Sequence, residues 1–233
     1  MKYKIILLLA LSVFVSACKK VTNVKLIDGP TAGKLSYKLS DDAGKGLAGV
    51  KVSVYDIGTY YSGGTPNPNA LVSTVQTDQE GIAYFADLLP KNYLVTTDSA
   101  SVNNVKYIAD EFVQVVAGTE KKKTIKVSEF SGLLNITLLS YNDYRTPLKN
   151  IGVLAYPTNA VQPNSANVKT IINEAVLKGV TDVNGFVSIR VPSNVNFNFI
   201  IYNLTNNNLS YGFGGYRVTK GGSTVVSLYS YPF

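Results

Sequence analysis

TDQEGIAYF at residues 77–85 is the segment from which the fold can be inferred, because it returns as TDVNGFVSI at residues 181–189. In both copies Thr-Asp-x-x-Gly comes directly before a run with strand-like composition. The aspartate side chain can accept hydrogen bonds from backbone N–H groups two residues further on, and the glycine can adopt a positive φ. Both stretches are therefore predicted to open β-hairpins. The predicted turn residues are Asp78, Gly81, Asp182 and Gly185.

Calcium binding is the alternative interpretation of these acidic turns. A calcium site takes about six to eight oxygen ligands. The first turn offers the carboxylates of Asp78 and Glu80, and the second offers that of Asp182 alone. The number of oxygens favours a structural turn, and no metal is expected.

A second pair of segments shows that the whole chain is duplicated. GLAGVKVSVY at residues 46–55 aligns with TPLKNIGVLAY at residues 146–156 if a slip of one residue is allowed. Each half then has the same order, with a turn that carries leucine, a strand that ends in tyrosine, a polar loop and Thr-Asp-x-x-Gly. Such a repeat indicates two similar domains in tandem. We expect them at 33–130 and 131–233, joined near 128–132 by too few residues for free swinging.

Apolar residues recur along the chain with the period of two that β-strands require. Each alternating stretch is short and is bounded by Gly, Pro, Asn or Asp. Only residues 167–179 carry a weak helical stripe. Short strands without interleaved helices predict an all-β chain of antiparallel sandwiches rather than an α/β enzyme. The alternating positions are Leu35, Tyr37 and Leu39; Val50, Val52 and Val54; Ile82 and Tyr84; Ile125 and Val127; Leu134, Ile136 and Leu138; Phe197, Phe199 and Ile201; and Val225 with Ser227, which flank Val226 and Leu228 on the other face.

The first copy resembles a known family. GKGLAGVKVSVY (44–55), TDQEGIAYF (77–85) and LLPKNYLV (88–95) are similar to the carboxypeptidase-regulatory-like, prealbumin-type β-sandwich domain, a relative of the repeat domains in bacterial surface adhesins. The resemblance extends over nearly all of 33–128 and, more weakly, over 132–233. It implies two tandem Ig-like (prealbumin-like) antiparallel β-sandwich domains with a non-catalytic accessory, spacer or adhesive role.

The sequence departs from the family pattern at two places. Asn92 stands where the family has glycine before tyrosine, and asparagine also enters the left-handed region. The second copy reads PSNVNF at 192–197, which leaves its strand register open there. Some relatives in adhesins carry a Lys–Asn isopeptide bond promoted by a buried acid. The strand after Tyr93 continues as Thr-Thr-Asp at 96–98, without a glutamate, so no such bond is predicted.

The N-terminus resembles a bacterial lipoprotein signal. Four residues with two lysines precede an apolar run at 5–15, which is too short to span a bilayer as a helix. VSAC at 15–18 resembles the lipobox, in which the cysteine is acylated. We expect a signal peptide at 1–17, a tether at 18–32 and palmitate-type chains on Cys18, the single cysteine. An ordinary secretory signal followed by a free cysteine is the alternative.

The net charge and the residues after Cys18 indicate which classes of partner to expect. Removal of the signal takes away two lysines and no acids, so the formal net charge falls from +7 to +5. The only dense basic run, 121–123, is predicted to be a solvated strand edge, and no nucleic acid is expected. The residues after Cys18 lack the acidic cluster that resembles a surface-export tag in Bacteroidota lipoproteins. We therefore expect the periplasmic face of the outer membrane, with the cell surface as the alternative, and a protein partner in the envelope.

The sequence offers few residues for enzymatic catalysis. The chain has no histidine, which removes Ser-His-Asp and Cys-His catalysis and the usual zinc ligands. Paired carboxylates of the glycosidase type are the remaining alternative, but most of the 15 acids lie at predicted turns or strand ends. The chain is thus predicted to be a structural or protein-interaction (adhesin or assembly-like) module without a cofactor.

Glycan binding, as an accessory lipoprotein of a polysaccharide uptake system, is the alternative function. Tyrosines among glycines could stack on sugar rings, although the chain lacks tryptophan and tyrosine is also a common strand and rim residue. The loop at 56–69 is the long loop where contacts are expected. DSA at 98–100 also resembles a three-residue O-glycosylation signal of the Bacteroidota, with Ser99 as acceptor. The candidate ligand contacts are Tyr60, Tyr61, Tyr211, Phe213 and Tyr216.

Overall fold

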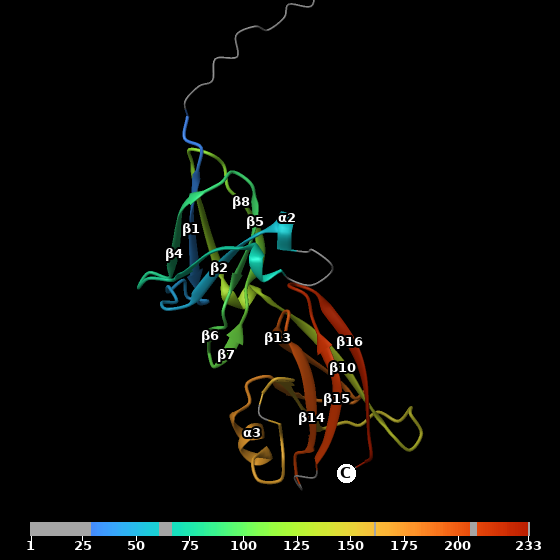
Figure 1. The fold of residues 1–233 in the computed structure, drawn as a ribbon. Helices are drawn as coiled ribbons and strands as arrows, with labels where there is room; N and C mark the ends of the chain where they lie inside the picture. Colours follow the sequence, from blue (N-terminus) through green and yellow to red (C-terminus); the bar gives the residue numbers. More distant parts are fainter. Residues whose placement is uncertain (1–28, 61–66, 161, 206–208, 233) are drawn as a thin grey trace, which may run out of the picture. The chain divides into compact units, whose positions relative to one another are not determined.

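The computed structural model describes residues 29–60, 67–160, 162–205 and 209–232 (Figure 1). The predicted signal peptide, Cys18 and most of the predicted tether lie outside the described residues. Within the described ranges, no helix is long and apolar enough to cross a membrane.

The first half of the chain folds into short strands that form two main sheets. Its elements are β1 (Gly33–Ser40), β2 (Lys51–Asp56), α2 (Ile57–Tyr60), η2 (Pro68–Ala70), β3 (Leu71–Gln76), β4 (Ile82–Leu88), β5 (Asn92–Thr97), β6 (Ala100–Val102), β7 (Val105–Tyr107), β8 (Asp110–Gln114), β9 (Glu120–Lys126) and η3 (Val127–Glu129). One sheet has the order β4-β1-β9 and the other β3-β2-β5-β8, while β6 and β7 form a separate hairpin. The lysine run at 121–123 therefore lies on the edge strand β9, as predicted.

The second half repeats this arrangement. Its elements are β10 (Ser131–Ser140), β11 (Ile151–Pro157), α3 (Val168–Glu174), β12 (Lys178–Val180), β13 (Phe186–Pro192), β14 (Asn196–Asn203), β15 (Leu209–Arg217) and β16 (Ser223–Ser230). The sheets have the orders β13-β10-β16 and β12-β11-β14-β15. The all-β class with two tandem antiparallel sandwiches is confirmed, and α3 lies within the segment predicted to be helical.

One strand pair in each sandwich is parallel. In the first sandwich, β1 residues 34–40 pair with β9 residues 120–126 in parallel. In the second, β10 residues 133–140 pair with β16 residues 223–230 in the same way. The other pairings between named strands are antiparallel in the described part of the chain. Each sandwich thus closes by placing its last strand beside its first.

Each sandwich has its own hydrophobic core between its two sheets. The first core is built from residues between Leu35 and Phe130, and the second from residues between Leu134 and Leu228. The alternating side chains of β1 are fully buried, as expected for a strand with one face on a core. Apolar area removed from water at both places is the main stabilising contribution to the fold.

The prediction of which residues of β4 face the core is wrong. The sequence pattern put Ile82 and Tyr84 on the apolar face of this strand, but Ala83 and Phe85 are the buried residues, and Tyr84 is 46% exposed. A shift of one residue moves every side chain of a strand to the opposite face. Because alanine and tyrosine are both compatible with either face, the local pattern alone does not decide between them.

Strand β14 is buried on both faces because α3 covers its outer side. Phe197, Phe199 and Ile201 face the sandwich core, whereas Ile200 belongs to a separate cluster with residues of β11 and Val168 of α3. Strands covered on both faces lose the simple alternation of apolar and polar residues.

A polar link crosses the first sandwich between its two sheets. The hydroxyl of Tyr37 on β1 donates a hydrogen bond to Oε1 of Glu111 on β8 at 2.9 Å. The other carboxylate oxygen of Glu111 lies 3.3 Å from Nζ of Lys123 on β9. Burial, together with the nearby carboxylate, raises the pKa of Tyr37 well above its ordinary value, so this phenol stays protonated and acts as a donor.

Candidate interaction surfaces

The first Thr-Asp-x-x-Gly segment is a tight turn whose aspartate is occupied by its own backbone. Oδ1 of Asp78 accepts hydrogen bonds from the N–H groups of Glu80 at 2.9 Å and Ile82 at 2.8 Å. Gly81 has φ of +79°, and a Cβ there would lie 2.3 Å from the carbonyl oxygen of Leu39. Glycine is needed at this position for its conformation and for its lack of a side chain.

The second segment has the same geometry. Oδ1 of Asp182 accepts hydrogen bonds from the N–H groups of Asn184 and Phe186, both at 2.8 Å. Gly185 has φ of +70°, and a Cβ there would lie 2.4 Å from the carbonyl oxygen of Leu138. Among the residues that the structure describes, no group of three or more His, Cys, Asp or Glu side chains is arranged to hold a metal ion.

The motif threonine ties each turn to the neighbouring leucine-bearing turn, a role that was not among the predicted ones. In the first sandwich, Oγ1 of Thr77 donates to the carbonyl oxygen of Leu47 at 2.6 Å and accepts from the N–H of Val50 at 2.9 Å. The corresponding bonds of the second sandwich measure 2.7 and 3.0 Å. They are made by Thr181 with Leu148 and Ile151. The presence of threonine in both copies was the available signal.

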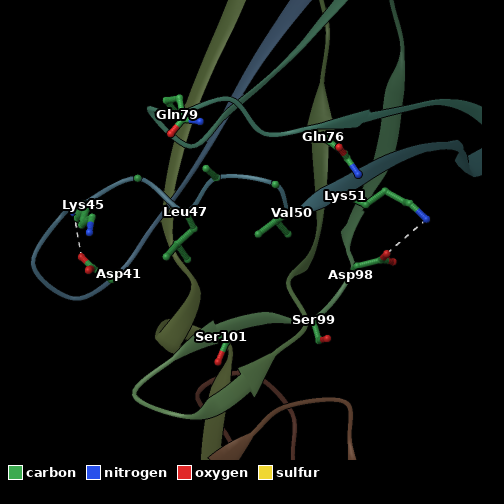
Figure 2. A pocket seen from close by; sticks show the side chains of 13 residues that line it. Asp41, Lys45, Leu47, Val50, Lys51, Gln76, Gln79, Asp98, Ser99 and Ser101 are labelled. Carbon is green, nitrogen blue, oxygen red and sulfur yellow. Dashed lines mark hydrogen bonds and ion pairs between the residues drawn. The ribbon is translucent and has the colours of Figure 1, made fainter.

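A polar hollow of about 860 Å³ lies beside the leucine-bearing turn of the first sandwich (Figure 2). On one side of it, Nζ of Lys51 lies 3.6 Å from a carboxylate oxygen of Asp98, and both side chains are exposed. Ser99 follows in the turn between β5 and β6, and its side chain is exposed. The hydroxyl of Ser99 is therefore accessible, which O-glycosylation requires, while the modification itself stays a prediction.

The tyrosines singled out in the first half lie largely outside the described structure. Tyr61 is not described, and for Tyr60 only the backbone, at the end of α2, is described. The rest of the predicted contact loop is described only at its two ends, where α2 and η2 lie, and not at 61–66.

In the second half, the predicted aromatic residues of β15 do not form a common platform. Tyr211 pairs with Ile200, which belongs to the cluster under α3, and is 37% exposed. Tyr216 packs against the sandwich core, with its ring centroid 5.5 Å from that of Phe199. The two tyrosines thus lie on opposite faces of their sheet. The side chain of Phe213 lies outside the described residues.

A different group of tyrosines gathers on the surface of the second sandwich. We call it the tyrosine cluster. Ring centroids are 5.1 Å apart for Tyr141 and Tyr144, 5.1 Å for Tyr141 and Tyr231, and 5.2 Å for Tyr144 and Tyr229. The four side chains are between 42% and 65% exposed. The rings touch one another and still present much of their area to water.

The parallel pair β10–β16 positions three of these rings. Leu139 pairs with Tyr229, and just beyond the strand the N–H of Tyr141 donates to the carbonyl oxygen of Ser230 at 2.8 Å. Tyr229 lies on β16 and Tyr231 directly follows its last residue, and both rings join the cluster. Tyr141 is consequently held next to Tyr231 by backbone hydrogen bonds rather than by ring contact alone.

The fourth ring is placed by a turn that Asp143 organises. Oδ1 of Asp143 accepts the N–H groups of Arg145 and Thr146, each at 3.0 Å, and the hydroxyl of Thr146 donates to the other oxygen. These hydrogen bonds lower the pKa of Asp143 to about 2. Within the turn, Tyr144 takes a left-handed conformation with φ of +58°, and its N–H donates to the carbonyl oxygen of Ser140 at 2.9 Å.

One hydroxyl of the cluster, that of Tyr144, is held in its protonated form. A hydrogen bond with Tyr141 raises the pKa of Tyr144 above its ordinary value. The hydroxyl of Tyr144 is thus available as a neutral donor and acceptor around neutral pH. In the sequence, the cluster corresponds to the spacings Tyr-x-x-Tyr at 141–144 and Tyr-x-Tyr at 229–231. Glycine does not flank these tyrosines, and they were not among the predicted ligand contacts.

Comparison with known proteins adds little about this site. No family model matches the sequence, and no curated protein sequence matches it. Among solved structures, the chain resembles the TIE protein of Bacillus anthracis, with 18% identity and a TM-score of 0.35 over 86% of this chain. It spans only 34% of that protein's length.

Two pilins show a similar degree of likeness. A minor pilin of Streptococcus agalactiae is 14% identical, with a TM-score of 0.34 over 85% of this chain and 95% of the pilin. A shaft pilin of Lactobacillus rhamnosus GG is 12% identical, with a TM-score of 0.32 over 87% of this chain and 98% of the pilin. At these values the likeness does not extend to partners or activity.

Proposed function

We propose that the chain is a non-catalytic interaction module of the bacterial envelope, held on the periplasmic face of the outer membrane by acyl chains on Cys18. The observation that carries the interaction role is the tyrosine cluster, where rings with 42% to 65% exposure meet on one surface. Contiguous exposed aromatic area on a stable fold is typical of binding surfaces.

The support for a contact surface comes from how the rings are held. Tyr144 occupies a left-handed backbone conformation that is unfavourable for a bulky residue. The Asp143 turn stabilises this conformation, and the result is contact of Tyr144 with Tyr141 and Tyr229 outside the core. Aromatic side chains fixed in this way lose little conformational entropy on binding.

The membrane anchor is tested with the full-length chain in cells. Cys18→Ala removes the only cysteine, so the protein should move from the membrane fraction to the soluble fraction and lose labelled palmitate, because stable attachment requires the acyl chains. Ser99→Ala is the matched control, since it leaves the signal intact and should stay at the membrane. Unchanged partition and labelling of the Cys18→Ala protein would contradict the anchor.

We also propose that Ser99 carries an O-linked glycan in an organism that has the corresponding transferase. The support is its exposed side chain in the short turn between β5 and β6. Intact mass spectrometry of the mature protein should show a loss of sugar mass in Ser99→Ala and none in Ser101→Ala. If the two variants differ from the wild type by the same mass, apart from the substitution itself, Ser99 is excluded as the glycosylation site.

A further inference from the structure

We propose that one end of the first sandwich lies against the lipid bilayer. It is the end at which the chain enters the sandwich, and we call it the entry end. It consists of the start of β1, the turn between β4 and β5 (89–91) and the turn between β8 and β9 (115–119). The inference rests on the proposed acyl anchor at Cys18 and adds a second, non-covalent contact with the membrane.

Backbone hydrogen bonds hold both turns at the place where the chain enters. The N–H of Gly118 donates to the carbonyl oxygen of Ala32, the residue before β1, at 2.8 Å. The N–H of Val115 donates to the carbonyl oxygen of Lys91 at 3.0 Å, which joins the two turns to each other. The first residues of the sandwich therefore share one surface with the two turns, as the chain path in Figure 1 shows.

Exposed apolar side chains gather at and next to the entry end. They belong to the two turns, to the last part of β8 and to the first residues of β3, which pair with the end of β2. In the described part of the first sandwich, only one large hydrophobic residue with comparable exposure, Tyr84 on β4, lies elsewhere. Such a grouping marks a contact surface. The residues, between 46% and 60% exposed, are Leu71, Val72, Leu89, Phe112 and Val116.

The position of the anchor specifies what faces this surface. Cys18 comes 15 residues before Gly33, so even an extended chain keeps the start of β1 within about 50 Å of the acylated cysteine. A surface on so short a tether meets the bilayer at a high effective concentration, and a weak contact suffices to hold it there. Apolar side chains can be buried about 5–10 Å deep at the boundary of headgroups and acyl chains without crossing the membrane.

The charges of the first sandwich orient it in the same sense. The charged side chains of the entry end are Lys34, Lys121 and Lys122, the acids Asp87 and Glu120, and the ion pair of Lys91 with Asp56. The predicted tether adds three lysines and one aspartate, so this end is net positive. At the opposite end, the turns at 41–49 and 77–81 carry four acids and one lysine. Anionic lipid headgroups therefore attract the entry end and repel the opposite end.

Tryptophan fluorescence can test this contact, because the chain has no tryptophan and one introduced residue is the only reporter. The full-length Leu89→Trp lipoprotein is reconstituted into vesicles of phosphatidylcholine and phosphatidylglycerol, with or without bromine on the acyl chains. Bromine quenches an indole that contacts it. Leu89→Trp should lose about half of its fluorescence or more in brominated vesicles, because its side chain is buried in the interface. Gln79→Trp is the matched control, since Gln79 is exposed in a turn at the opposite end and should keep its fluorescence.

A second set of variants tests whether the apolar side chains make the contact. Val116→Trp serves as the reporter, and its quenching should fall at least about twofold when Leu89→Ser/Phe112→Ser removes the neighbouring apolar area. Tyr84→Ser is the control, because Tyr84 is equally exposed but lies away from the entry end. It should leave the quenching unchanged. The replaced side chains are all exposed, so the core is preserved, which amide NMR spectra of the variants verify.

Flotation of the same vesicles separates this inference from the anchor. A protein that floats with the vesicles, but whose Leu89→Trp form is quenched no more than its Gln79→Trp form, keeps the anchor and loses the membrane contact. A protein that does not float loses both. Unchanged quenching of Val116→Trp in the Leu89→Ser/Phe112→Ser background would also overturn the inference. So would loss of self-association in that background without loss of quenching, which would assign the surface to a second copy of the chain.

Discussion

The two sandwiches share one hydrogen-bonded frame at their first turn but expose different side chains beside it. In each, a leucine N–H donates to the carbonyl oxygen of the motif glycine at 2.8 Å, which makes Leu39 equivalent to Leu138. The parallel pairings then make Lys126 equivalent to Tyr229, because their partners Ser40 and Leu139 follow these leucines directly.

Two residues further along each of these strands, Asp42 is equivalent to Tyr141, and Ser128 is equivalent to Tyr231. In the first sandwich the hydroxyl of Ser128 donates a hydrogen bond to Asp42. In the second, the corresponding rings lie 5.1 Å apart. The two positions thus meet in both sandwiches, once as a small polar pair and once as an aromatic pair. The frame thus determines where side chains meet, while a few exposed residues determine what the surface can bind.

The strongest way to break the shared frame is to add a methyl group at a motif glycine. Gly185→Ala and Gly81→Ala should each lower the free energy of unfolding of their own sandwich by about 2–4 kcal/mol, because a Cβ would lie 2.4 or 2.3 Å from a carbonyl oxygen at positive φ. Chemical denaturation followed by amide NMR measures the loss in each half separately.

Gly44→Ala is the control for this pair. Gly44 also has a positive φ, of +85°, but a Cβ there meets nothing within 4 Å, so only about 1 kcal/mol should be lost. If residues 33–130 and 131–233 are separate domains, each should also give dispersed amide signals when expressed alone. Unfolding of both halves by Gly185→Ala would instead mean that the two cores depend on each other.

Lowering the pH should have a smaller effect, and it should affect the tyrosine cluster of the second sandwich more than the first sandwich. The lowered pKa of Asp143 means that its carboxylate stabilises the turn above the ordinary aspartate range, and that this contribution is lost as the pH falls through about 2. Nuclear Overhauser contacts between the rings of Tyr141 and Tyr144 should persist at pH 4 and weaken towards pH 2, whereas core signals of the first sandwich change less.

Asp143→Asn keeps the shape of the side chain but removes the charge that titrates. Its ring contacts should be weaker than in the wild type at pH 4 and should no longer change between pH 4 and pH 2. Ring contacts that are insensitive both to pH and to this replacement would show that the turn holds Tyr144 without the carboxylate.

Local chemistry made the frame predictable. The Asx-type turn and the glycine with positive φ depend on residues within five positions of one another, so the sequence shows them directly. The helix at α3 was visible for the same reason. The face of Tyr84 was not, since its neighbours on β4 suit either side of the sheet.

The tyrosine cluster could not be assembled from local patterns. It joins residues of 141–144 with residues of 229–231, about 90 positions later, through a parallel strand pairing that no short motif announces. A tyrosine flanked by glycine is easy to notice, yet Tyr216 uses its ring to fill the core. Exposure of a ring depends on tertiary pairing, which the sequence pattern does not contain.

The parallel pairing of first and last strands also determines how each sandwich bears mechanical load. A chain anchored at its N-terminus and pulled from beyond its end applies force to the start of β1 and to the end of β9. Because these strands run side by side in the same direction, residues 34–40 must slide past residues 120–126 together, instead of separating one pair at a time. The same holds for β10 and β16. The hydrogen bonds of each pair therefore resist tension in shear, collectively, along the line between anchor and load.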